Sequence, residues 1–167
     1  MNTELADFFK FNLWANLSML DACSNLTDAQ LDATARGTYG NIRATLVHIV
    51  AGEEGYVRRF TGQQPEAAFR EGDPFPGFDE LRRRARQSGE GLIAIAEQLE
   101  HGQLLQLSYQ GQVLAVPAIF VLIQAINHGA DHRSQVATLL SQQDVMPPEL
   151  DGWAYYDAVS RLDSSES

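Results

Sequence analysis

The sequence has a single cysteine and no long hydrophobic run, and both scarcities limit where the protein can work. Cys23 cannot form an intrachain disulfide, which fits a reducing compartment. No stretch approaches the roughly 20 uninterrupted apolar residues that span a bilayer. The N-terminal segment carries Glu4 and Asp7 where a signal peptide would carry basic residues followed by an apolar run. We therefore expect a cytoplasmic protein that does not associate with membranes.

Positive charge is also scarce in this sequence. The chain has 12 Lys and Arg residues against 22 Asp and Glu, which gives a formal net charge of -10. A field of this sign repels polyanions, so we expect no nucleic-acid partner. The local exception is Arg82-Arg83-Arg84 with Arg86. Because no aromatic residues are interleaved with these arginines, they are more typical of a solvated helix face than of a phosphate-binding patch.

The composition that remains is that of an ordinary globular domain. Hydrophobic residues make up 44% of the chain and charged residues 20%, so the chain has neither the polarity of a disordered protein nor the apolarity of a membrane protein. A length of 167 residues is sufficient for one continuous core. We expect a single domain over residues 1–162 and a disordered tail over residues 163–167.

Apolar residues recur at steps of three and four in four long segments, which is the period of amphipathic helices. The predicted helices cover residues 3–23, 42–60, 79–101 and 119–140. A capping box at residues 27–30 predicts a short additional helical turn between the first two. Amphipathic helices bury their apolar faces best against one another, so we predict an all-α fold, an antiparallel four-helix bundle.

The segments between these helices predict three smaller features. Residues 61–77 are rich in proline and glycine and indicate a long surface loop, which could also be a crossover connection. Residues 104–115 alternate around Gln110-Gly111 and predict a small hairpin between the third and fourth long helices. After Pro147-Pro148 we expect a short C-terminal helix, carrying Trp153, that folds over one end of the bundle.

Two histidines stand four residues apart in the last long helix. His128 and His132 would project from one helical face with Cβ atoms roughly 5–6 Å apart, so one metal ion could bind both rings. Such pairs also occur by chance, and the alternative is a solvated or packing pair. Gln124 and Gln135 flank the pair on the same face and could orient a substrate. The opposite face is apolar too, so this helix could pack against a second protomer.

A third histidine lies in the second long helix, within an almost wholly apolar stretch. By itself His48 is typical of a core histidine with satisfied hydrogen bonds. With His128 and His132 it would complete the three-ligand arrangement of catalytic metal sites, which leave one position open. Gly52 and Gly55 share its helical face and would leave room for a substrate. The alternative is that these glycines permit close helix packing.

Three segments of the chain resemble the DinB/YfiT-like family: FNLWAN at 11–16, NIRATLVHI at 41–49 and NHGADHRSQ at 127–135. The resemblance extends to DGWAYY at 151–156. It implies a four-helix bundle in which His48, His128 and His132 hold nickel, zinc or a similar ion, commonly in a homodimer. Similar proteins include transferases that join a low-molecular-weight thiol to an electrophile, and a thiol-dependent maleylpyruvate isomerase.

Two classes of function follow from these residues. In the first, three imidazoles hold one divalent transition metal ion that lowers the pKa of a thiol or a water, which then attacks a small-molecule substrate. Thiol S-transfer is the favoured reaction and hydrolysis the second. No general base can be named, so the catalytic residues are unassigned. In the other class, the same ligands serve a non-catalytic metal or small-ligand binding protein of the stress response.

Overall fold

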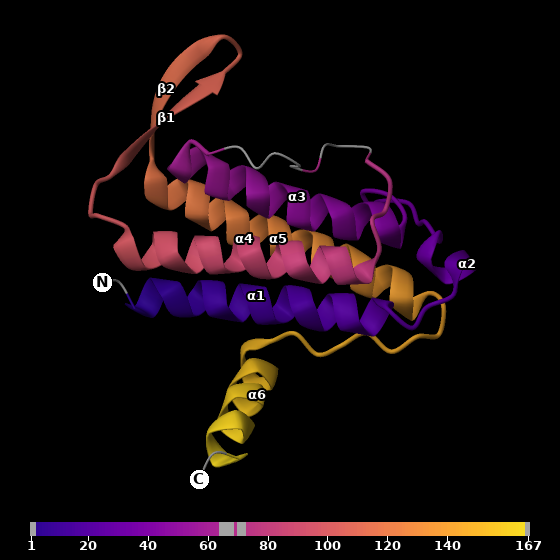
Figure 1. Ribbon diagram of the computed structural model, residues 1–167. Helices are drawn as coiled ribbons and strands as arrows, with labels where there is room; N and C mark the ends of the chain where they lie inside the picture. The colour runs from indigo at the N-terminus through magenta and orange to yellow at the C-terminus, as the bar shows by residue number, and fades with distance from the viewer. Residues whose placement is uncertain (1–2, 64–68, 70–72, 166–167) are drawn as a thin grey trace.

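In the computed structural model, which describes residues 3–63, 69 and 73–165, six helices and one β-hairpin follow one another along the chain (Figure 1). The elements are α1 (Thr3–Cys23), α2 (Asp28–Leu31), α3 (Ile42–Thr61), α4 (Phe78–Gln98), β1 (Leu104–Tyr109), β2 (Gln112–Pro117), α5 (Ala118–Ser141) and α6 (Gly152–Ser165). The described chain is therefore mostly helical with a small two-stranded sheet. The long helices lie within three residues of their predicted bounds.

The four long helices α1, α3, α4 and α5 pack side by side, but neighbours along the chain do not always alternate in direction (Figure 1). The first halves of α3 and α4 share one apolar cluster and their second halves share another, so these two helices are parallel. By the same contacts, α1 and α5 are parallel to each other and antiparallel to that pair. The predicted antiparallel order therefore holds for α1 against α4 and for α3 against α5, and is wrong for α3 against α4.

The connection between α3 and α4 explains this order. Residues 62–77 separate the two helices, and an extended chain of that length spans about 50 Å, more than the roughly 30 Å length of α4. The chain can therefore return to the starting end of α3 before α4 begins. This is the crossover that the sequence left open. Residues 64–68 and 70–72 of the predicted surface loop lie outside the described residues.

The core consists of two apolar clusters with a polar layer between them. One cluster gathers the second half of α1, the first halves of α3 and α4, and the second half of α5, including Met19, Leu46 and Leu139. The other gathers the opposite halves of the same helices, including Phe9 and Leu122. Each long helix carries buried polar side chains between the two clusters. They are Asn12 and Asn16 on α1, Glu53 on α3, Ser88 on α4 and Arg133 on α5.

Local capping explains where several helices start and stop. The predicted capping box is present at α2, where the Thr27 hydroxyl accepts from the backbone N–H of Gln30. Asn41 caps α3 through its side-chain oxygen, and Gly62 ends that helix in the left-handed conformation at φ 67°. The third long helix was predicted to begin at residue 79, but α4 begins at Phe78, with Gly77 as its N-cap. Asp79 lies in the first turn, where a carboxylate interacts favourably with the helix dipole.

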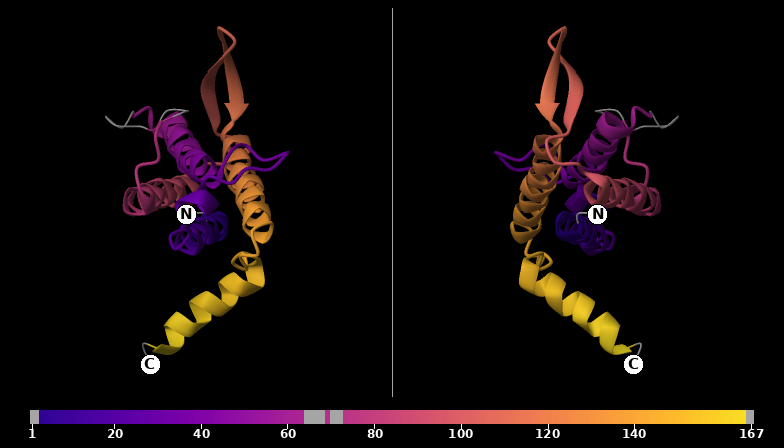
Figure 2. Two further views of the ribbon diagram at one scale, coloured as in Figure 1. Left: turned by 90° about the vertical axis from the view of Figure 1, so that its right-hand side faces the viewer. Right: turned by 90° about the vertical axis from the view of Figure 1, so that its left-hand side faces the viewer.

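The predicted hairpin is confirmed and projects away from the long helices at the start of α5 (Figures 1 and 2). Its strands pair antiparallel, with Leu107 opposite Leu114. Gln110 and Gly111 both have positive φ, 49° and 77°, as a two-residue turn with the twist of a hairpin requires. Leu104, like Leu114, is an exposed apolar residue of the hairpin.

The C-terminal helix α6 does not cover one end of the bundle, which corrects the prediction. The ring of Tyr155 packs on Phe11 and Trp14 of α1, with centroids 5.6 and 5.3 Å away, and the helix then points away from the other helices (Figure 2). Trp153 is left 80% exposed. The helix also continues to Ser165, three residues into the segment expected to be disordered, whose last two residues lie outside the described ranges.

The described helices include none that is long and apolar enough to cross a membrane.

Candidate metal centre

Three histidines from two packed helices converge on one point. His48 lies on α3, and His128 and His132 lie one turn apart on α5, which packs against α3. One ring nitrogen from each residue lies within 4.8 Å of the corresponding nitrogens of the other two. The three ring centroids are 4.6 to 4.8 Å apart. These are the residues that the sequence selected, and the fold positions them to bind a metal ion.

His48 and His128 approach each other through their Nε2 atoms, which are 3.0 Å apart. Two nitrogens that bind one zinc-like ion at about 2.0–2.1 Å lie about 2.9–3.4 Å from each other, for bond angles between a right angle and the tetrahedral angle. Burial, followed by the neighbouring imidazoles of His132 and His48, lowers the pKa of His128 to about 4. The His128 ring is therefore neutral at neutral pH and keeps a lone pair for a cation.

Gly52 makes room for the His128 ring on the surface of α3. A Cβ atom at this position would lie 2.6 Å from His128 Cε1 and 3.0 Å from His128 Nδ1, which is closer than atoms pack. The Nδ1 atom is buried and has no hydrogen-bond partner in the described part of the chain. The position of the ring is thus set by the close approach of a helix backbone, while its Nε2 atom faces the other ligands.

Gln135 sets the tautomer of His132. Its Oε1 atom accepts a hydrogen bond of 2.8 Å from the backbone N–H of Tyr39, so this atom is an oxygen and cannot donate. The Nδ1 atom of His132 lies 3.2 Å from the same oxygen and must therefore carry the proton. The Nε2 atom of His132 is left with its lone pair, the form that binds a metal.

Tyr39 adds an aromatic surface that the sequence reasoning missed. Its ring stacks on His48 at a centroid distance of 3.9 Å and an interplanar angle of 16°, and it meets His132 edge-on at 5.5 Å. Tyr39 lies in the connection before α3, outside any periodic segment, so helical spacing carried no signal for it. The contact arises only because the connection folds back across the start of α3 toward Gln135.

A cleft of about 650 Å³ opens beside the histidines. This is within the range of roughly 300–1,000 Å³ that small-molecule sites occupy. Of the predicted pocket residues, Gly52 and Gly55 line the cleft, whereas Gln124 is exposed elsewhere on α5 and Gln135 lies behind His132. The cleft is lined by Tyr39, Ala44, Val47, His48, Ala51, Gly52, Gly55, Tyr56, Arg58, Arg59, Phe69, Asp73 and His128.

Behind the histidines, the polar layer of the core forms a bridged ion pair. Arg133 donates to the side-chain oxygens of Asn12 and Asn16 at 2.9 and 2.6 Å, and the two amide nitrogens donate to Glu53 Oε1 at 2.6 and 2.7 Å. Ser88 donates to the other oxygen of Glu53 at 2.9 Å. Burial raises the pKa of Glu53, and these donors and the charge of Arg133 oppose that rise.

This bridged pair ties the four long helices together at the level of the metal centre. Glu53 follows Gly52, and Arg133 follows His132, so each end of the pair is joined to a residue of the site. Apolar periodicity did not predict the roles of these side chains, because it selects only apolar residues. The signal that was available is that Asn12 and Asn16 are themselves spaced by one helical turn.

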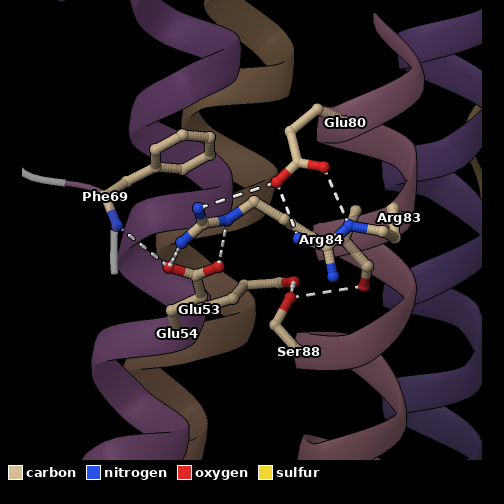
Figure 3. A network of polar contacts seen from close by, with 8 residues as sticks. Glu53, Glu54, Phe69, Glu80, Arg83, Arg84 and Ser88 are labelled. Carbon is tan, nitrogen blue, oxygen red and sulfur yellow. Dashed lines mark hydrogen bonds and ion pairs between the residues drawn. The ribbon is translucent and has the colours of Figure 1, made fainter. Parts of the chain in front are cut away.

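A second ion pair holds Phe69, one of the residues that line the cleft (Figure 3). Arg84 of α4 donates to both oxygens of Glu54 on α3, each at 2.6 Å. The guanidinium also lies over the Phe69 ring, 3.6 Å from its centroid, and the Phe69 N–H donates to Glu54 at 3.3 Å. Because Arg84 and Glu54 are largely buried, solvent screens this pair little. The pair fixes Phe69 at the edge of the cleft.

Two other reactive side chains lie apart from the site. His101 is exposed in the turn after α4. Cys23 is buried in the core, where desolvation raises the pKa of its thiol to about 12, so it is not a nucleophile at neutral pH. A set of three imidazoles beside a cleft, with one of them hydrogen-bonded to Gln135, therefore remains as the chemical centre. Imidazole nitrogen suits zinc, nickel and similar divalent ions.

The chain was compared with protein families and with solved structures. A crystal structure of a DinB-like protein from Bacillus cereus ATCC 10987 matches with a TM-score of 0.66, over 89% of this chain and 99% of that one, at 20% sequence identity. No curated protein matches the chain. The sequence model of the DinB family matches residues 1–162, a range that contains all three histidines. The chain therefore belongs to the DinB family.

Proposed function

We propose that this protein is a metal-dependent enzyme that transfers a low-molecular-weight thiol to an electrophile. The observation that carries the proposal is the convergence of His48, His128 and His132 within 4.8 Å of one another, with two of them on the wall of a cleft of small-molecule size. Three protein ligands leave at least one coordination position open, which distinguishes catalytic from structural metal sites.

His48, His128 and His132 would hold the divalent ion, with nickel or zinc as the best candidates. Bound there, the ion would act as a Lewis acid that lowers the pKa of a thiol entering from the cleft, so that the thiolate is available at neutral pH. By accepting from Nδ1, Gln135 favours the tautomer of His132 whose Nε2 atom can bind the ion. Because the pKa of His128 is lowered, protons at neutral pH do not compete with the metal ion for the lone pair of its ring.

The reaction needs no redox partner. The thiol loses its proton to solvent, the sulfur forms a bond to an electrophilic carbon, and the leaving group departs with the electron pair of the bond that breaks. Residues of the cleft supply binding and orientation, and Tyr39 shields one face of His48 from water. A cytoplasmic location, which the sequence favours, would place the enzyme among low-molecular-weight thiols.

The test compares metal-loaded and metal-free protein with a panel of thiols and a chlorodinitrobenzene as electrophile. We expect formation of the aryl thioether with loaded wild-type protein and its loss in His132→Ala. His101→Ala is the matched control, because His101 is an exposed histidine outside the cluster, and it should keep full activity. Equal rates in loaded, metal-free and His132→Ala protein would overturn the transferase proposal.

Two other outcomes would point to the alternative functions. Tight metal binding without turnover of any thiol would indicate a non-catalytic metal-binding protein. Hydrolysis of an ester or amide that depends on His132 but not on an added thiol would indicate a metal-dependent hydrolase.

We also propose that the protein forms a homodimer through the outer face of α5. Phe120 and Ile123 are exposed there by 60% and 54%, and Ile126 extends the same apolar surface. Exposed apolar patches of this kind mark protein interfaces. Light scattering should give twice the mass of the chain for wild-type protein and a monomer for the Phe120→Glu, Ile123→Glu double variant. A monomeric wild-type protein would rule out the dimer.

A further inference from the structure

The cleft extends along one stripe of α3, away from the metal centre. His48, Gly52, Gly55 and Arg59 stand at steps of three and four, so they share one helical face, and all four line the cleft. The two glycines add no side chains of their own to this floor, on which the His128 ring rests at Gly52 and the Arg59 guanidinium lies at Gly55. A bound molecule can therefore lie along the helix and contact both the histidines and Arg59.

Arg59 reaches back into this cleft. Its Nη1 atom lies 3.6 Å from the position of a Cβ atom at Gly55, which is ordinary contact distance. Its Cζ atom lies over the Tyr56 ring at 5.1 Å from the centroid, and Tyr56 in turn meets His128 edge-on at 5.8 Å. The cation–π contact holds the guanidinium on the side of the cleft that leads to the metal centre.

Among the residues that the structure describes, the two arginines of the cleft have no anionic partner. Neither Arg58 nor Arg59 forms an ion pair or a side-chain hydrogen bond with any described residue. Asp73 also lines the cleft, so the described lining carries two arginines against one carboxylate, a net positive charge before any metal is added. In a protein of net charge -10, a positive cleft of this kind selects for an anion.

Stabilisation of the helix end is the other role that two arginines in the last turn of α3 can have. Arginine side chains on a helix lean toward its N-terminus, however, and Arg59 follows this rule by lying over Gly55 and Tyr56. It therefore points away from the terminal carbonyl groups, one of which, that of Arg58, is already bonded to the Gly62 N–H at 2.9 Å.

We infer that Arg59, assisted by Arg58, binds a carboxylate of the substrate, so that the cleft takes an elongated anionic thiol. The rise of α3 from His48 to Gly55, above which the guanidinium lies, is about 10 Å. The thiol and the carboxylate should be separated by about this distance. The inference rests on the proposed function, because it assigns the sulfur end of the molecule to the histidines.

The experiment uses ω-mercaptoalkanoates of increasing chain length, each beside its uncharged primary amide, with binding to zinc-loaded protein measured by calorimetry. The thiol and carboxylate of mercaptooctanoate are about 10 Å apart when the chain is extended, whereas those of mercaptopropionate are too close to span the cleft. We expect mercaptooctanoate to bind wild-type protein at least about tenfold more tightly than its amide, since hydrogen bonds to charged groups contribute that much or more. Mercaptopropionate should show no such preference.

Three variants test whether the preference for the carboxylate depends on the two arginines of the cleft. Arg59→Gln should reduce the preference of mercaptooctanoate over its amide to about twofold or less, and adding Arg58→Gln should remove what remains. Arg86→Gln is the matched control, because Arg86 is an exposed arginine on α4 without an ion-pair partner among the described residues, and it should keep the full preference. The binding of 2-mercaptoethanol, which carries no carboxylate, should be the same in all of these proteins.

A further arm separates this inference from the proposed function. Octanoate and octanamide lack a thiol, and their effect on the melting temperature of zinc-free protein reports on the arginine end alone. If thiols fail to bind the zinc-loaded protein while octanoate still stabilises wild-type but not Arg59→Gln protein, the anion site stands and the thiol function fails. If thiols bind with equal affinity whether they carry a carboxylate or an amide, the anion site is overturned and the thiol function stands.

Discussion

A Cβ atom at Gly52 would stand 2.6 Å from the Cε1 atom of His128, so the metal-ligand ring of α5 rests directly on the backbone of α3. Real Cβ atoms do not approach other atoms so closely, and any side chain at position 52 must displace the ring. The spacing of the two helices and the position of His128 thus depend on one missing side chain. A glycine that costs helix stability is retained where it makes a close approach possible.

Gly52→Ala should weaken metal binding about tenfold or more, as changes that reposition a ligand do. The His128 ring must move, and its Nε2 atom then no longer lies at 3.0 Å from that of His48. Competition with a chromophoric chelator would measure the affinity. Gly55→Ala is the control, because its Cβ atom would make only an ordinary contact of 3.6 Å, with Arg59. Equal affinities in the two variants would contradict the argument.

Adding zinc or nickel should stabilise the protein against heat. A ligand at 100 times its dissociation constant contributes about 2.7 kcal/mol, which corresponds to a rise of roughly 5–10 °C for a domain of this size. His48→Ala should lose most of this rise, whereas His101→Ala should keep it. Differential scanning calorimetry of protein prepared without a histidine tag would provide the measurement. A melting temperature that neither metal changes would show that the histidines do not bind a metal and serve only as core residues.

Glu53→Ala should destabilise the fold by about 3–5 kcal/mol, because it leaves the buried charge of Arg133 uncompensated. It also leaves the two bridging amides and Ser88 without their acceptor. Urea unfolding would measure the change. Glu90→Ala, an exposed carboxylate on α4, should change the stability by no more than about 0.5 kcal/mol.

The two ends of the bridged pair should also be energetically coupled. Removing both charges in Glu53→Gln, Arg133→Met leaves no unpaired ion in the core, so the double variant should be less destabilised than the sum of its single variants, by about 0.5–3 kcal/mol. Additive effects would show that the two charges do not interact through Asn12 and Asn16.

Cys23 should be unreactive in the native protein. Burial raises the pKa of its thiol to about 12 from 9.0, so almost no thiolate exists at pH 8, and an aromatic disulfide reagent should react only after denaturation. The unfolded thiol ionises first as the pH rises, so this group favours unfolding above about pH 9. Cys23→Ala should therefore lose less stability than wild-type protein between pH 9 and 12. Rapid labelling of the native thiol would contradict this description.

The local features of the fold were predictable because local interactions decide them. The bounds of the long helices, the capping box at Thr27 and the hairpin turn at Gln110-Gly111 depend on residues that are neighbours in sequence. The three histidines were predictable for a related reason. The spacing of His128 and His132 already places them on one face of one helix, and His48 is the histidine of another long apolar helix.

The buried face of α1 shows where this reasoning failed. Phe8 belongs to the apolar repeat that predicts this helix, and apolar periodicity therefore favours its burial, but the side chain is 61% exposed, while Asn12 and Asn16 are fully or almost fully buried. Hydrophobicity alone cannot recognise a polar residue as part of a core, because its burial becomes favourable only when partners are present. Those partners, Glu53 and Arg133, come from two other helices.

The amino-acid sequence by itself determined which segments are helical, where they are capped and which imidazoles are available as ligands, since these properties depend on propensity and spacing within one element. Only the tertiary structure decided that α3 and α4 run in the same direction, that Tyr39 and Gln135 meet His132, and that Arg59 shares a cleft with the histidines. The physical reason is that such contacts join residues far apart along the chain. Their formation depends on how whole helices pack, and no local pattern encodes the direction or rotation of one helix relative to another.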